Sequence, residues 1–450
     1  IREAAKLMKA RRVGSILVVE DGLPIGIVTD TDFRNKVVAE HLPVDQPIAS
    51  IMSSPVKSIG SQFSFSEVLI KMIRARTHHL VITEDGTHES PAVGMVSDHD
   101  IMLAQNNSPS ALIRRLAKAE DPKQWAAMRD QAEDIVADYL EKELSIELIS
   151  NFITEVNDAL IERAVQYAIQ QVPKAQAINF CWLSLGSEGR EEQLLRTDQD
   201  NALLYEGTAE GTHEVMLSVA KHVNDLLEQC GFEECPAEIM ARNPSYNLSL
   251  DGWRQRFGQW IQSPDPQALL NSTIFFDFRP VYGDRSLAVQ LQHALIDLID
   301  QNDIFLNHLA ANALQNPPPL SFFKKFLVEK SGKHEDQFDI KKRGMMPLSD
   351  MARVLMLQYR IVDVQNTSDR FKRLAKIDSK NRELYHSAGQ AHHMMMRIRA
   401  KYGLKNKNSG RFIDIESMTK LEKQILKSAF APIKDLQEML ETRFQLAYFR

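Results

Sequence analysis

One short stretch of the chain combines the residue types that bind metal ions and phosphates. Residues 178–205 read INFCWLSLGSEGREEQLLRTDQDNALLY, where one apolar run ends before Gly186 and another follows Asp198 and Asp200. Alternate residues of a strand point to the same side, so we expect the carboxylates of Asp198 and Asp200 to converge. Carboxylates this close repel each other unless a cation lies between them. Mg²⁺ prefers oxygen ligands and retains substrate phosphates, so the pattern predicts a magnesium site that handles phosphates.

The turn before these aspartates has the composition of a phosphate-binding loop. Gly186 and Ser187 allow backbone N–H groups to approach a phosphate, and Arg190 can neutralise its charge. The alternative is a surface turn with two solvated aspartates. A lone Asp-x-Asp pair is weak evidence, but the glycine turn, Arg190 and the spacing together favour a binding site.

The full string G-S-x-G-R-x-E…T-D-x-D resembles the nucleotidyltransferase signature of the polymerase-β superfamily, and it is closer still to bacterial PII-protein uridylyltransferases. The resemblance implies that an acceptor attacks the α-phosphate of a nucleoside triphosphate at a two-metal Mg²⁺ site and that pyrophosphate leaves. It makes Asp198 and Asp200 catalytic metal ligands and assigns triphosphate binding to Gly186, Ser187 and Arg190. By analogy with the uridylyltransferases, the acceptor is a protein.

The superfamily needs a third carboxylate on a later strand, and Asp277 is our candidate. It lies in the apolar and aromatic run 272–280, where we expect a strand, and a buried acid is costly there unless it is paired or metal-bound. Arg279 lies two residues later, on the same side of such a strand, where it can hold the triphosphate or neutralise Asp277. The rival carboxylates are Asp251 and Asp284.

An internal repeat opens the chain. Residues 5–34 and 68–102 each read as an amphipathic helix, a β-branched strand, an Asp-Gly turn, a second strand and a T/S-x-x-D segment. This pattern resembles the CBS domain, a βαββα unit that occurs as tandem pairs and binds adenosine nucleotides between the copies. The resemblance covers residues 1–107, and the first copy lacks its opening strand.

In the CBS family the T/S-x-x-D segment holds the ribose, because a carboxylate can accept hydrogen bonds from both hydroxyls. The resemblance places this role on Thr29 and Asp32 in the first copy and on Ser97 and Asp100 in the second. The alternative is that Asp32 and Asp100 only cap the helices that follow them. The regulatory ligand that we expect is therefore an adenosine nucleotide.

Helical patterns fill the rest of the chain. Residues 110–172 carry apolar residues at helical spacing, and the chain after residue 284 is mostly helical. The run from Lys341 to Gly344 holds three consecutive cations, which either bind phosphates or form a solvated loop. No HD-type metal motif is recognisable, since His392-His393 is followed by methionines, so the reverse, deuridylylating activity is not expected.

Charge is divided unevenly along the chain. Residues 1–320 carry 27 Lys and Arg against 45 Asp and Glu, whereas residues 321–450 carry 27 against 15. The basic segment either faces an anion, such as a nucleotide or an acidic partner, or is a solvated helical surface. Nucleic acid is not the expected partner, because the one run of aromatic residues interleaved with cations, residues 322–326, looks amphipathic.

Composition gives the broad class. No apolar stretch is long enough to span a bilayer, no signal peptide is recognisable, and three cysteines make no disulfide framework. We therefore expect a cytoplasmic protein without a membrane partner. The first residue is Ile, which predicts that upstream residues are missing, and CBS pairs often associate, which favours a homodimer.

These observations predict a multidomain α+β protein. It comprises a tandem CBS pair (1–107), a helical connector (108–173), a polymerase-β-like nucleotidyltransferase α/β domain (174–284) and a helical C-terminal domain (285–450). The leading hypothesis is a nucleotide-regulated signal-transduction nucleotidyltransferase, and the whole chain resembles a bacterial family of this kind. The alternatives are a non-catalytic nucleotide-sensing protein and a nucleic-acid-modifying transferase.

Overall fold

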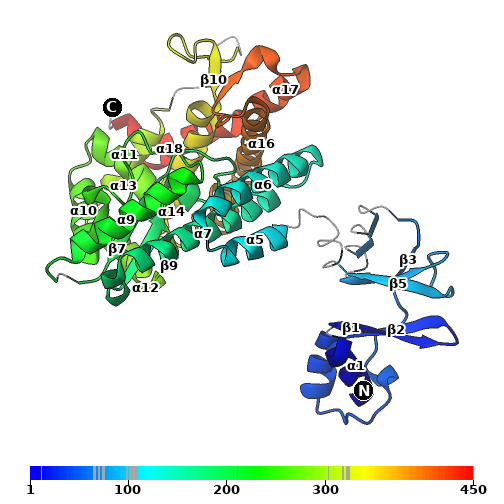
Figure 1. Ribbon diagram of the computed structural model, residues 1–450. Coiled ribbons are helices and arrows are strands. Elements are labelled where there is room, and N and C mark those ends of the chain that lie inside the picture. Colours follow the sequence, from blue (N-terminus) through cyan, green and yellow to red (C-terminus); the bar gives the residue numbers. More distant parts are fainter. Residues whose placement is uncertain are drawn as a thin grey trace. The chain divides into compact units, whose positions relative to one another are not determined.

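The computed structural model describes residues 1–11, 13–63, 67–68, 71–72, 75, 77–97, 100, 109–207, 209–302, 304–316, 319–320 and 325–448. The chain forms two compact units, residues 1–111 and 112–450 (Figure 1). Each unit buries apolar side chains of its own. The protein is thus multidomain with mixed α and β structure, as the sequence predicts.

The first repeat copy is built on an antiparallel pair of strands. Helix α1 (Arg2–Arg11) precedes β1 (Ser15–Glu20) and β2 (Leu23–Thr29), which pair in register from end to end apart from one bulge. Asp21 and Gly22 form the turn between the strands with φ angles of 49° and 81°, a conformation that Asp-Gly pairs favour. Short helical segments follow: α2 (Asp30–Asp32), η1 (Phe33–Val38) and η2 (Ile48–Ser50).

The second copy contains a three-stranded sheet in the order β3-β4-β5. Strand β3 (Ser58–Gly60) runs parallel to β4 (His79–Thr83), and β4 runs antiparallel to β5 (Ala92–Ser97). The helix expected after β5 lies largely outside the described residues, since only Asp100 of the segment 98–108 is described.

A four-stranded sheet in the order β8-β7-β6-β9 lies in the second unit. Strands β6 (Phe180–Ser184) and β7 (Asn201–Tyr205) are antiparallel and buried at every residue, as their uninterrupted apolar sequences predict. Strand β8 (Asn247–Ser249) runs parallel to β7, and β9 (Arg279–Gly283) runs antiparallel to β6. The two central strands, β6 and β7, lie at the two ends of the segment 178–205. The sheet therefore positions the residues that are predicted to do chemistry.

Two pairs of helices pack against this sheet. Helix α7 (Ile146–Gln171) contacts α9 (Thr212–Gln229), and α10 (Leu250–Gln262) contacts α12 (Arg285–Asp300). The helices α5 (Pro109–Lys118) and α6 (Pro122–Glu141) precede α7 in the chain. From residue 112 onward, these helices belong to the same compact unit as the sheet. The division of the chain into four parts, which the sequence suggests, stays a prediction.

The C-terminal part of the chain is mostly helical, as expected, and it also contains one small two-stranded sheet. Helix α14 (Met346–Gln358) is its centre, since every residue from Pro347 to Leu357 is buried. The sheet pairs β10 (Gln337–Asp339) with β11 (Phe412–Asp414) in antiparallel orientation. The other helices of this part are α13 (Phe305–Ala313), η5 (Lys341–Met345), α15 (Thr367–Ile377), η6 (Ser379–Asn381), α16 (Arg382–Asn406), η7 (Ile415–Ser417), α17 (Lys420–Ser428), α18 (Ala431–Arg443) and η8 (Leu446–Tyr448).

The run 272–280 is not one strand, so that expectation was wrong. Helix α11 (Pro266–Phe275) extends into it because the Asp265 side chain caps the helix start and Pro266 occupies its first turn. Strand β9 begins only at Arg279. Asp277 therefore lies in the turn between α11 and β9, and the alternation argument that placed it beside Arg279 does not apply.

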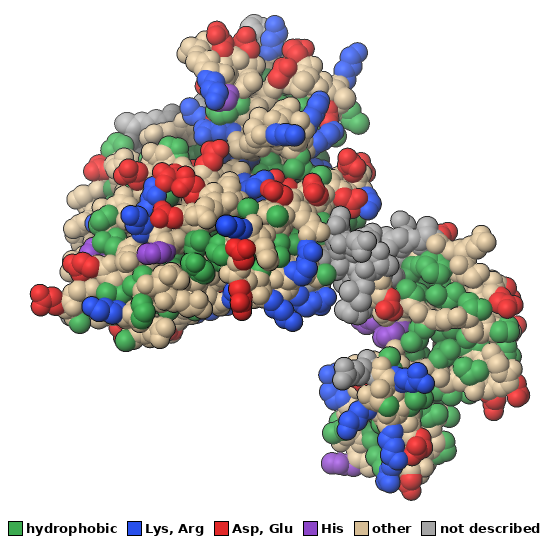
Figure 2. All heavy atoms as spheres, in the orientation of Figure 1, with side chains coloured by type: hydrophobic (Ala, Val, Ile, Leu, Met, Phe, Trp, Pro, Cys, Tyr) green, Lys and Arg blue, Asp and Glu red, His purple; other side chains and the backbone are tan. Residues whose placement is uncertain are grey.

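The surface of the second unit carries side chains of both charges (Figure 2). On the face of the second unit seen in Figure 2, acidic and basic side chains are interspersed over the same elements. None of the helices in the described part of the chain combines the length and the apolar character that crossing a membrane requires.

Candidate functional site

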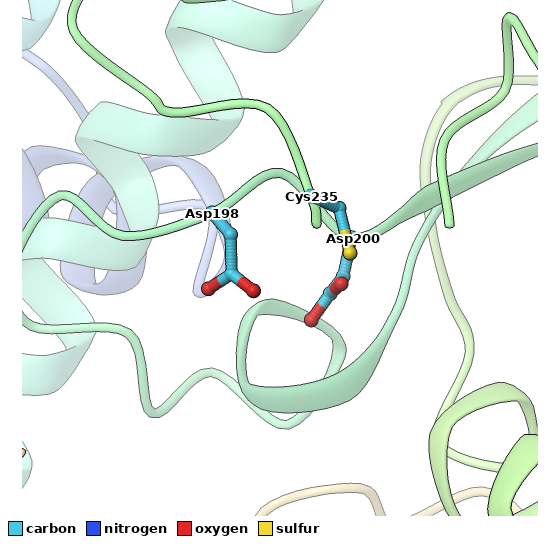
Figure 3. Close-up of side chains that lie close together, drawn as sticks. All are labelled: Asp198, Asp200 and Cys235. Carbon is cyan, nitrogen blue, oxygen red and sulfur yellow. The ribbon is translucent and has the colours of Figure 1, made fainter. Parts of the chain in front are cut away.

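The structure brings Asp198 and Asp200 together and adds Cys235 to them (Figure 3). One ligand atom from each of the three side chains lies within 4.8 Å of the others. Asp200 directly precedes β7, and Asp198 forms a parallel β-bridge with Glu233, two residues before Cys235. The bridge is closed by the Gln199 N–H, which donates to the Glu233 carbonyl at 2.9 Å. Backbone pairing on two segments thus places the three side chains side by side.

The glycine turn packs directly against this cluster. Gly186 begins the short helix α8 (Gly186–Gly189) with a φ of +53°, a conformation that glycine adopts without strain. A Cβ atom at this position would lie 2.8 Å from Oδ2 of Asp200. The N–H of Leu185 donates to the carbonyl of Asp200 at 2.9 Å. Gly186 is required here because both the backbone conformation and the close approach of Asp200 exclude a side chain.

Burial and charge repulsion perturb the cluster. Burial, followed by the neighbouring Asp198 carboxylate, raises the pKa of Asp200 to about 7. Burial and the Asp200 carboxylate raise the pKa of the Cys235 thiol to about 11. A bound cation would favour the ionised form of both carboxylates. The electrostatics are those of a site suited to a divalent metal ion.

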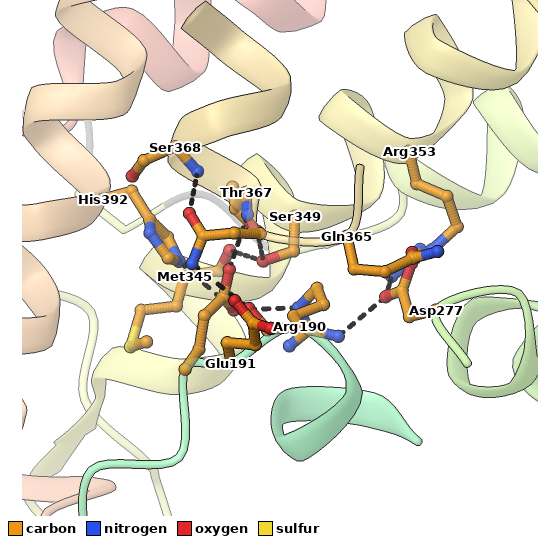
Figure 4. A network of polar contacts seen from close by, with 12 residues as sticks. Arg190, Glu191, Asp277, Met345, Ser349, Arg353, Gln365, Thr367, Ser368 and His392 are labelled. Carbon is orange, nitrogen blue, oxygen red and sulfur yellow. Dashed lines mark hydrogen bonds and ion pairs between the residues drawn. The ribbon is translucent and has the colours of Figure 1, made fainter. Parts of the chain in front are cut away.

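Asp277 is not part of this cluster, which corrects the expectation of a third carboxylate ligand. Its buried carboxylate forms ion pairs with Arg190 and Arg353 (Figure 4) and also with Arg370, each at 2.8 Å or less. Burial alone would raise the pKa of Asp277, but the three guanidinium groups outweigh it and hold the pKa well below its usual range. The cost of burying this acid is thus offset by arginines.

The rival carboxylates do not join the cluster either. Asp251 is exposed on α10 and pairs with Arg254 at 3.1 Å. Asp284 caps α12 by accepting a hydrogen bond from the Ser286 N–H at 2.8 Å. Within the described residues, the two aspartates and Cys235 are the only group of acidic, His and Cys side chains close enough to share an ion.

The two arginines expected at the triphosphate are both engaged elsewhere. Arg190 donates from Nε to Glu192 and from Nη1 to Asp277, both at 2.8 Å. Arg279 donates two hydrogen bonds, of 2.6 and 2.7 Å, to Asp158 of α7, and it does not pair with Asp277. Both guanidinium groups therefore join parts of the fold, and neither is free to serve as the primary phosphate ligand.

The contacts of Arg190 extend into the C-terminal helices. Glu192 accepts a hydrogen bond from the Thr367 N–H at 2.8 Å, and the Thr367 hydroxyl donates to Ser349 at 3.0 Å. The His392 ring lies 3.7 Å from Glu192, and burial lowers its pKa to about 4. Figure 4 shows how this polar network joins the loop after α8 to helices α14, α15 and α16.

Two cations of the C-terminal part lie close enough to the aspartates to interact with them electrostatically. Lys341 interacts electrostatically with both Asp198 and Asp200, and Arg399 interacts with Asp198. The run from Lys341 to Gly344 was noticed in the sequence as a possible phosphate ligand. Sequence reasoning missed Arg399 and Cys235, because no local motif marks either residue and only the positive charge of residues 321–450 hinted at the first.

In the CBS repeats, each predicted ribose-binding aspartate bonds to its own T/S-x-x-D segment. Asp32 accepts hydrogen bonds from the backbone and hydroxyl of Thr29 at 2.9 and 2.8 Å. Asp100 accepts the equivalent bonds from Ser97 at 2.9 and 2.6 Å. The two copies thus share one local geometry, in which the aspartate orients the hydroxyl residue three positions before it.

Comparison with known families matches three parts of the chain. The family described as "Putative nucleotidyltransferase DUF294" matches residues 130–267, and the "Putative nucleotidyltransferase substrate binding domain" matches residues 303–444. The CBS domain matches residues 1–39 and 48–107.

Individual relatives match smaller parts. The Meiotically up-regulated gene 70 protein of Schizosaccharomyces pombe is 32% identical over 129 residues, which is 28% of this chain and only 17% of that protein. The CBS domain-containing protein YhcV of Bacillus subtilis is 31% identical over 111 residues, which is 25% of this chain and 76% of that protein. A solved CBS domain protein from Pyrobaculum aerophilum, complexed with AMP, is 25% identical over 24% of this chain and 84% of its own, with a TM-score of 0.21.

We predict that Asp277→Asn strongly destabilises the second unit, because the substitution removes the acid paired with buried Arg370 and leaves buried Arg353 with Asp350 alone. Breaking a buried ion pair in this way typically lowers the free energy of unfolding by about 3–5 kcal/mol. All four tryptophans lie in residues 112–450, so tryptophan fluorescence during denaturant unfolding reports on this unit. Asp251→Asn at the exposed surface is the matched control, and equal stability of the two variants would contradict the prediction.

A second prediction concerns Glu188, which is buried in α8 and accepts a hydrogen bond from Ser184 at 3.1 Å. Burial, with Asp158 nearby, raises its pKa from 4.5 to about 7. The folded protein therefore binds this proton more tightly than the unfolded chain, so the stability it contributes is present below about pH 4.5 and lost as pH rises to about 7.

In Glu188→Gln the neutral amide replaces the protonated acid. We expect its melting temperature, followed by tryptophan fluorescence, to fall less than that of the wild type as pH rises from about 5 to about 7.5. Glu155→Gln, an exposed position on α7, should follow the wild type. Parallel pH profiles for the wild type and both variants would show that Glu188 does not titrate in this range.

Proposed function

The chain belongs to the DUF294 family of nucleotidyltransferases with CBS domains and a C-terminal substrate-binding domain, and from this premise we propose that it transfers a nucleoside monophosphate from a nucleoside triphosphate to an acceptor. The observation that carries the proposal is the pair Asp198 and Asp200, held against the turn at Gly186. A phosphoryl-transfer site needs anionic metal ligands beside a turn that a triphosphate can approach, and these residues supply both.

The residues at the site fit a divalent metal ion. Asp198 and Asp200 supply the oxygen ligands that Mg²⁺ prefers. The third neighbour, Cys235, is a thiol, which suits Zn²⁺ better than Mg²⁺ or Mn²⁺. We therefore propose divalent-metal dependence with Asp198 and Asp200 as ligands, and Mg²⁺ as the first ion to test against Mn²⁺ and Zn²⁺. When bound, the ion would neutralise charge on the reacting phosphate.

In this proposal the turn at Gly186 and two arginines position the substrate. Gly186 keeps the turn open beside Asp200, and Ser187 presents the start of α8 to the phosphates. Arg190 and Arg279 act indirectly. The network of Arg190 and Asp277 holds the turn against the C-terminal helices, and the ion pair of Arg279 holds strand β9 against α7. A rigid frame of this kind lowers the entropic cost of bringing triphosphate and acceptor together.

The acceptor and the base of the nucleotide belong to the same proposal. We propose a protein acceptor and uridylyl transfer, by the resemblance of the motif to PII-protein uridylyltransferases. The test is incubation of the protein with each labelled nucleoside triphosphate, a divalent ion and a cell extract, asking which macromolecule becomes labelled. A labelled nucleic acid would favour the third hypothesis instead.

A second candidate function, nucleotide binding without turnover, is favoured by one observation. Asp277 pairs with arginines, so the described part of the chain offers two carboxylates and a thiol where the resemblance implies three carboxylates. Nucleotide binding that is equal in the presence of all metals, with no labelled product from any triphosphate, would support this candidate.

We also propose that the CBS pair binds an adenosine nucleotide and that this ligand regulates transfer. The proposal rests on the CBS match of residues 1–39 and 48–107 and on the shared hydrogen-bonding geometry of Thr29-Asp32 and Ser97-Asp100. Homodimerisation through the pair and a cytoplasmic location complete the proposal. The three cysteines are free and buried, which suits a reducing compartment.

For transfer, we predict that Asp198→Asn and Asp200→Asn each reduce the rate by about 100-fold or more, because even outer-shell changes at metal sites cost about 10–100-fold. The amide keeps the shape and removes the charge that the metal ion needs. Initial rates with the labelled triphosphate measure the effect. The rival carboxylate variant Asp251→Asn is the control and should keep wild-type activity, whereas full activity of either site variant would exclude this metal site.

For the CBS pair, we predict that Asp100→Ala weakens binding of an adenosine nucleotide by about 1–3 kcal/mol, the usual loss when a charged hydrogen-bond partner is removed. Isothermal titration of AMP and ATP into the full chain measures it, with exposed Asp45→Ala as the control. If the wild type binds neither nucleotide, or if Asp100→Ala binds both equally well, the pair has a structural role only.

A further inference from the structure

Lys341 and Arg399 are two half-buried cations that form no ion pair within the described part of the chain. Some cations near them do: Arg343 pairs with Glu329 at 3.1 Å, and Arg411 pairs with Asp339 at 2.8 Å. Lys401, close to Arg399 in α16, pairs with Glu422 at 2.6 Å. Acidic side chains are thus available in this part of the fold, yet they neutralise other residues.

The backbone holds Lys341 firmly in place. The Ile340 N–H donates to the Arg411 carbonyl at 3.0 Å, which continues the pairing of β10 with β11, and the Lys342 N–H donates to Asp339 at 2.8 Å. Lys341 then begins η5, and Gly344 of η5 is packed so tightly that a Cβ would lie 2.4 Å from Sδ of Met395 in α16. Lys341 is therefore presented by a turn that is fixed on helix α16.

The same helix carries Arg399 and is packed against the segment that leads into Asp198. A Cβ on Gly403 would lie 2.3 Å from Cδ1 of Leu195, three residues before Asp198. Arg399 precedes Gly403 by four residues, which places the two on one face of the helix. Arg399 also lines a small pocket with Leu194 and Leu195, and its Nε donates to the Ser409 carbonyl at 3.0 Å.

Both cations are partly withdrawn from water beside the two aspartates. Burial, and then the nearby Arg399, lower the pKa of Lys341, while Asp198 and Asp200 act against this shift. Burial lowers the pKa of Arg399 to about 10, and Asp198 again opposes the shift. A desolvated cation without an acid partner costs folding free energy. Two such cations beside a pair of carboxylates are suited to an anion that brings a metal ion with it.

We propose that Lys341 and Arg399 form the anion-binding half of the site and hold the β- and γ-phosphates of the incoming nucleoside triphosphate. The inference rests on the proposed function and adds the residues that bind the leaving group. In the transfer step the acceptor oxygen forms a bond to the α-phosphorus while the bond from that phosphorus to the bridging oxygen of the β-phosphate breaks. The acceptor proton passes to solvent, and pyrophosphate leaves with the electron pair, its charge neutralised by Lys341 and Arg399.

The test uses inorganic tripolyphosphate, which carries the phosphate chain without base or sugar. We expect the full chain to bind it in the presence of Mg²⁺ or Mn²⁺ by isothermal titration. Lys341→Met and Arg399→Met should each weaken this binding about tenfold or more, because a hydrogen bond to a charged group is worth at least about the 1.4 kcal/mol of a tenfold change. Lys341→Arg and Arg399→Lys keep the charge and should recover most of the affinity.

Matched controls separate a binding role from a structural one. Lys342→Met, at the exposed neighbour of Lys341, and Lys401→Met, on the same helix as Arg399, should bind tripolyphosphate like the wild type. Tryptophan fluorescence should give Lys341→Met a melting temperature no lower than that of the wild type, because the substitution replaces a half-buried cation that forms no ion pair within the described residues. A purely structural role for Lys341 would lower the melting temperature and leave the affinity unchanged.

The possible outcomes are distinct. Wild-type affinity for tripolyphosphate in both Met variants, or no binding to the wild-type protein, overturns the inference. If the variants lose affinity for a single-stranded oligonucleotide but not for tripolyphosphate, the cations hold an acceptor's phosphates and the inference is again wrong. If the wild type binds tripolyphosphate and the variants do not, but no triphosphate yields a labelled product, the anion site stands and the proposed transfer fails.

Discussion

The buried Asp277 carboxylate, surrounded by Arg190, Arg353 and Arg370, is the interaction on which the rest of the second unit depends. It joins the corner between α11 and β9, the loop after α8, and helices α14 and α15. Three guanidinium groups around one carboxylate would leave excess positive charge in the interior. Glu192 and Asp350 supply the remaining countercharge, at 2.8 Å from Arg190 and from Arg353 respectively, so three acids balance three bases. Because each group is costly to bury without its partners, the cluster specifies one arrangement of these elements.

That arrangement determines what faces the aspartates of the sheet. The network from Arg190 through Glu192 to Thr367 holds the C-terminal helices beside the loop that follows Gly186. Helix α16 is fixed by close packing at Gly344 and Gly403, where side chains would collide with Met395 and Leu195. Consequently close packing fixes the backbone segments that carry Lys341 and Arg399. The two aspartates, which we propose as metal ligands, lie just before strand β7, and the cations come from helices more than a hundred residues later in the chain.

Local sequence patterns predicted the elements whose chemistry is local. The repeat with its two Asp-Gly turns, the convergence of an Asp-x-Asp pair and the glycine turn depend on residues a few positions apart. The run 272–280 was misread because a short apolar and aromatic run fits a strand or a buried helix equally well. Since Asp277 is paired with Arg353 and Arg370, its role depends on residues distant in sequence, which no local pattern reveals. Cys235 reached the cluster only through the pairing of its segment with that of Asp198.

The opposite electrostatic effects at the site would have a common explanation in the ligand that we propose. Burial disfavours the charged form of both groups: it raises the pKa of Asp200 and lowers the pKa of Lys341. Each group would be relieved by a charge of the other sign, yet they form no ion pair with one another. A divalent ion bound to a triphosphate carries both signs in one ligand, and in our proposal the ion would lie toward the aspartates and the phosphates toward the cations. The ion and the triphosphate would then stabilise each other's binding, because each would remove a repulsion that the other meets alone, and by linkage the coupling would be reciprocal.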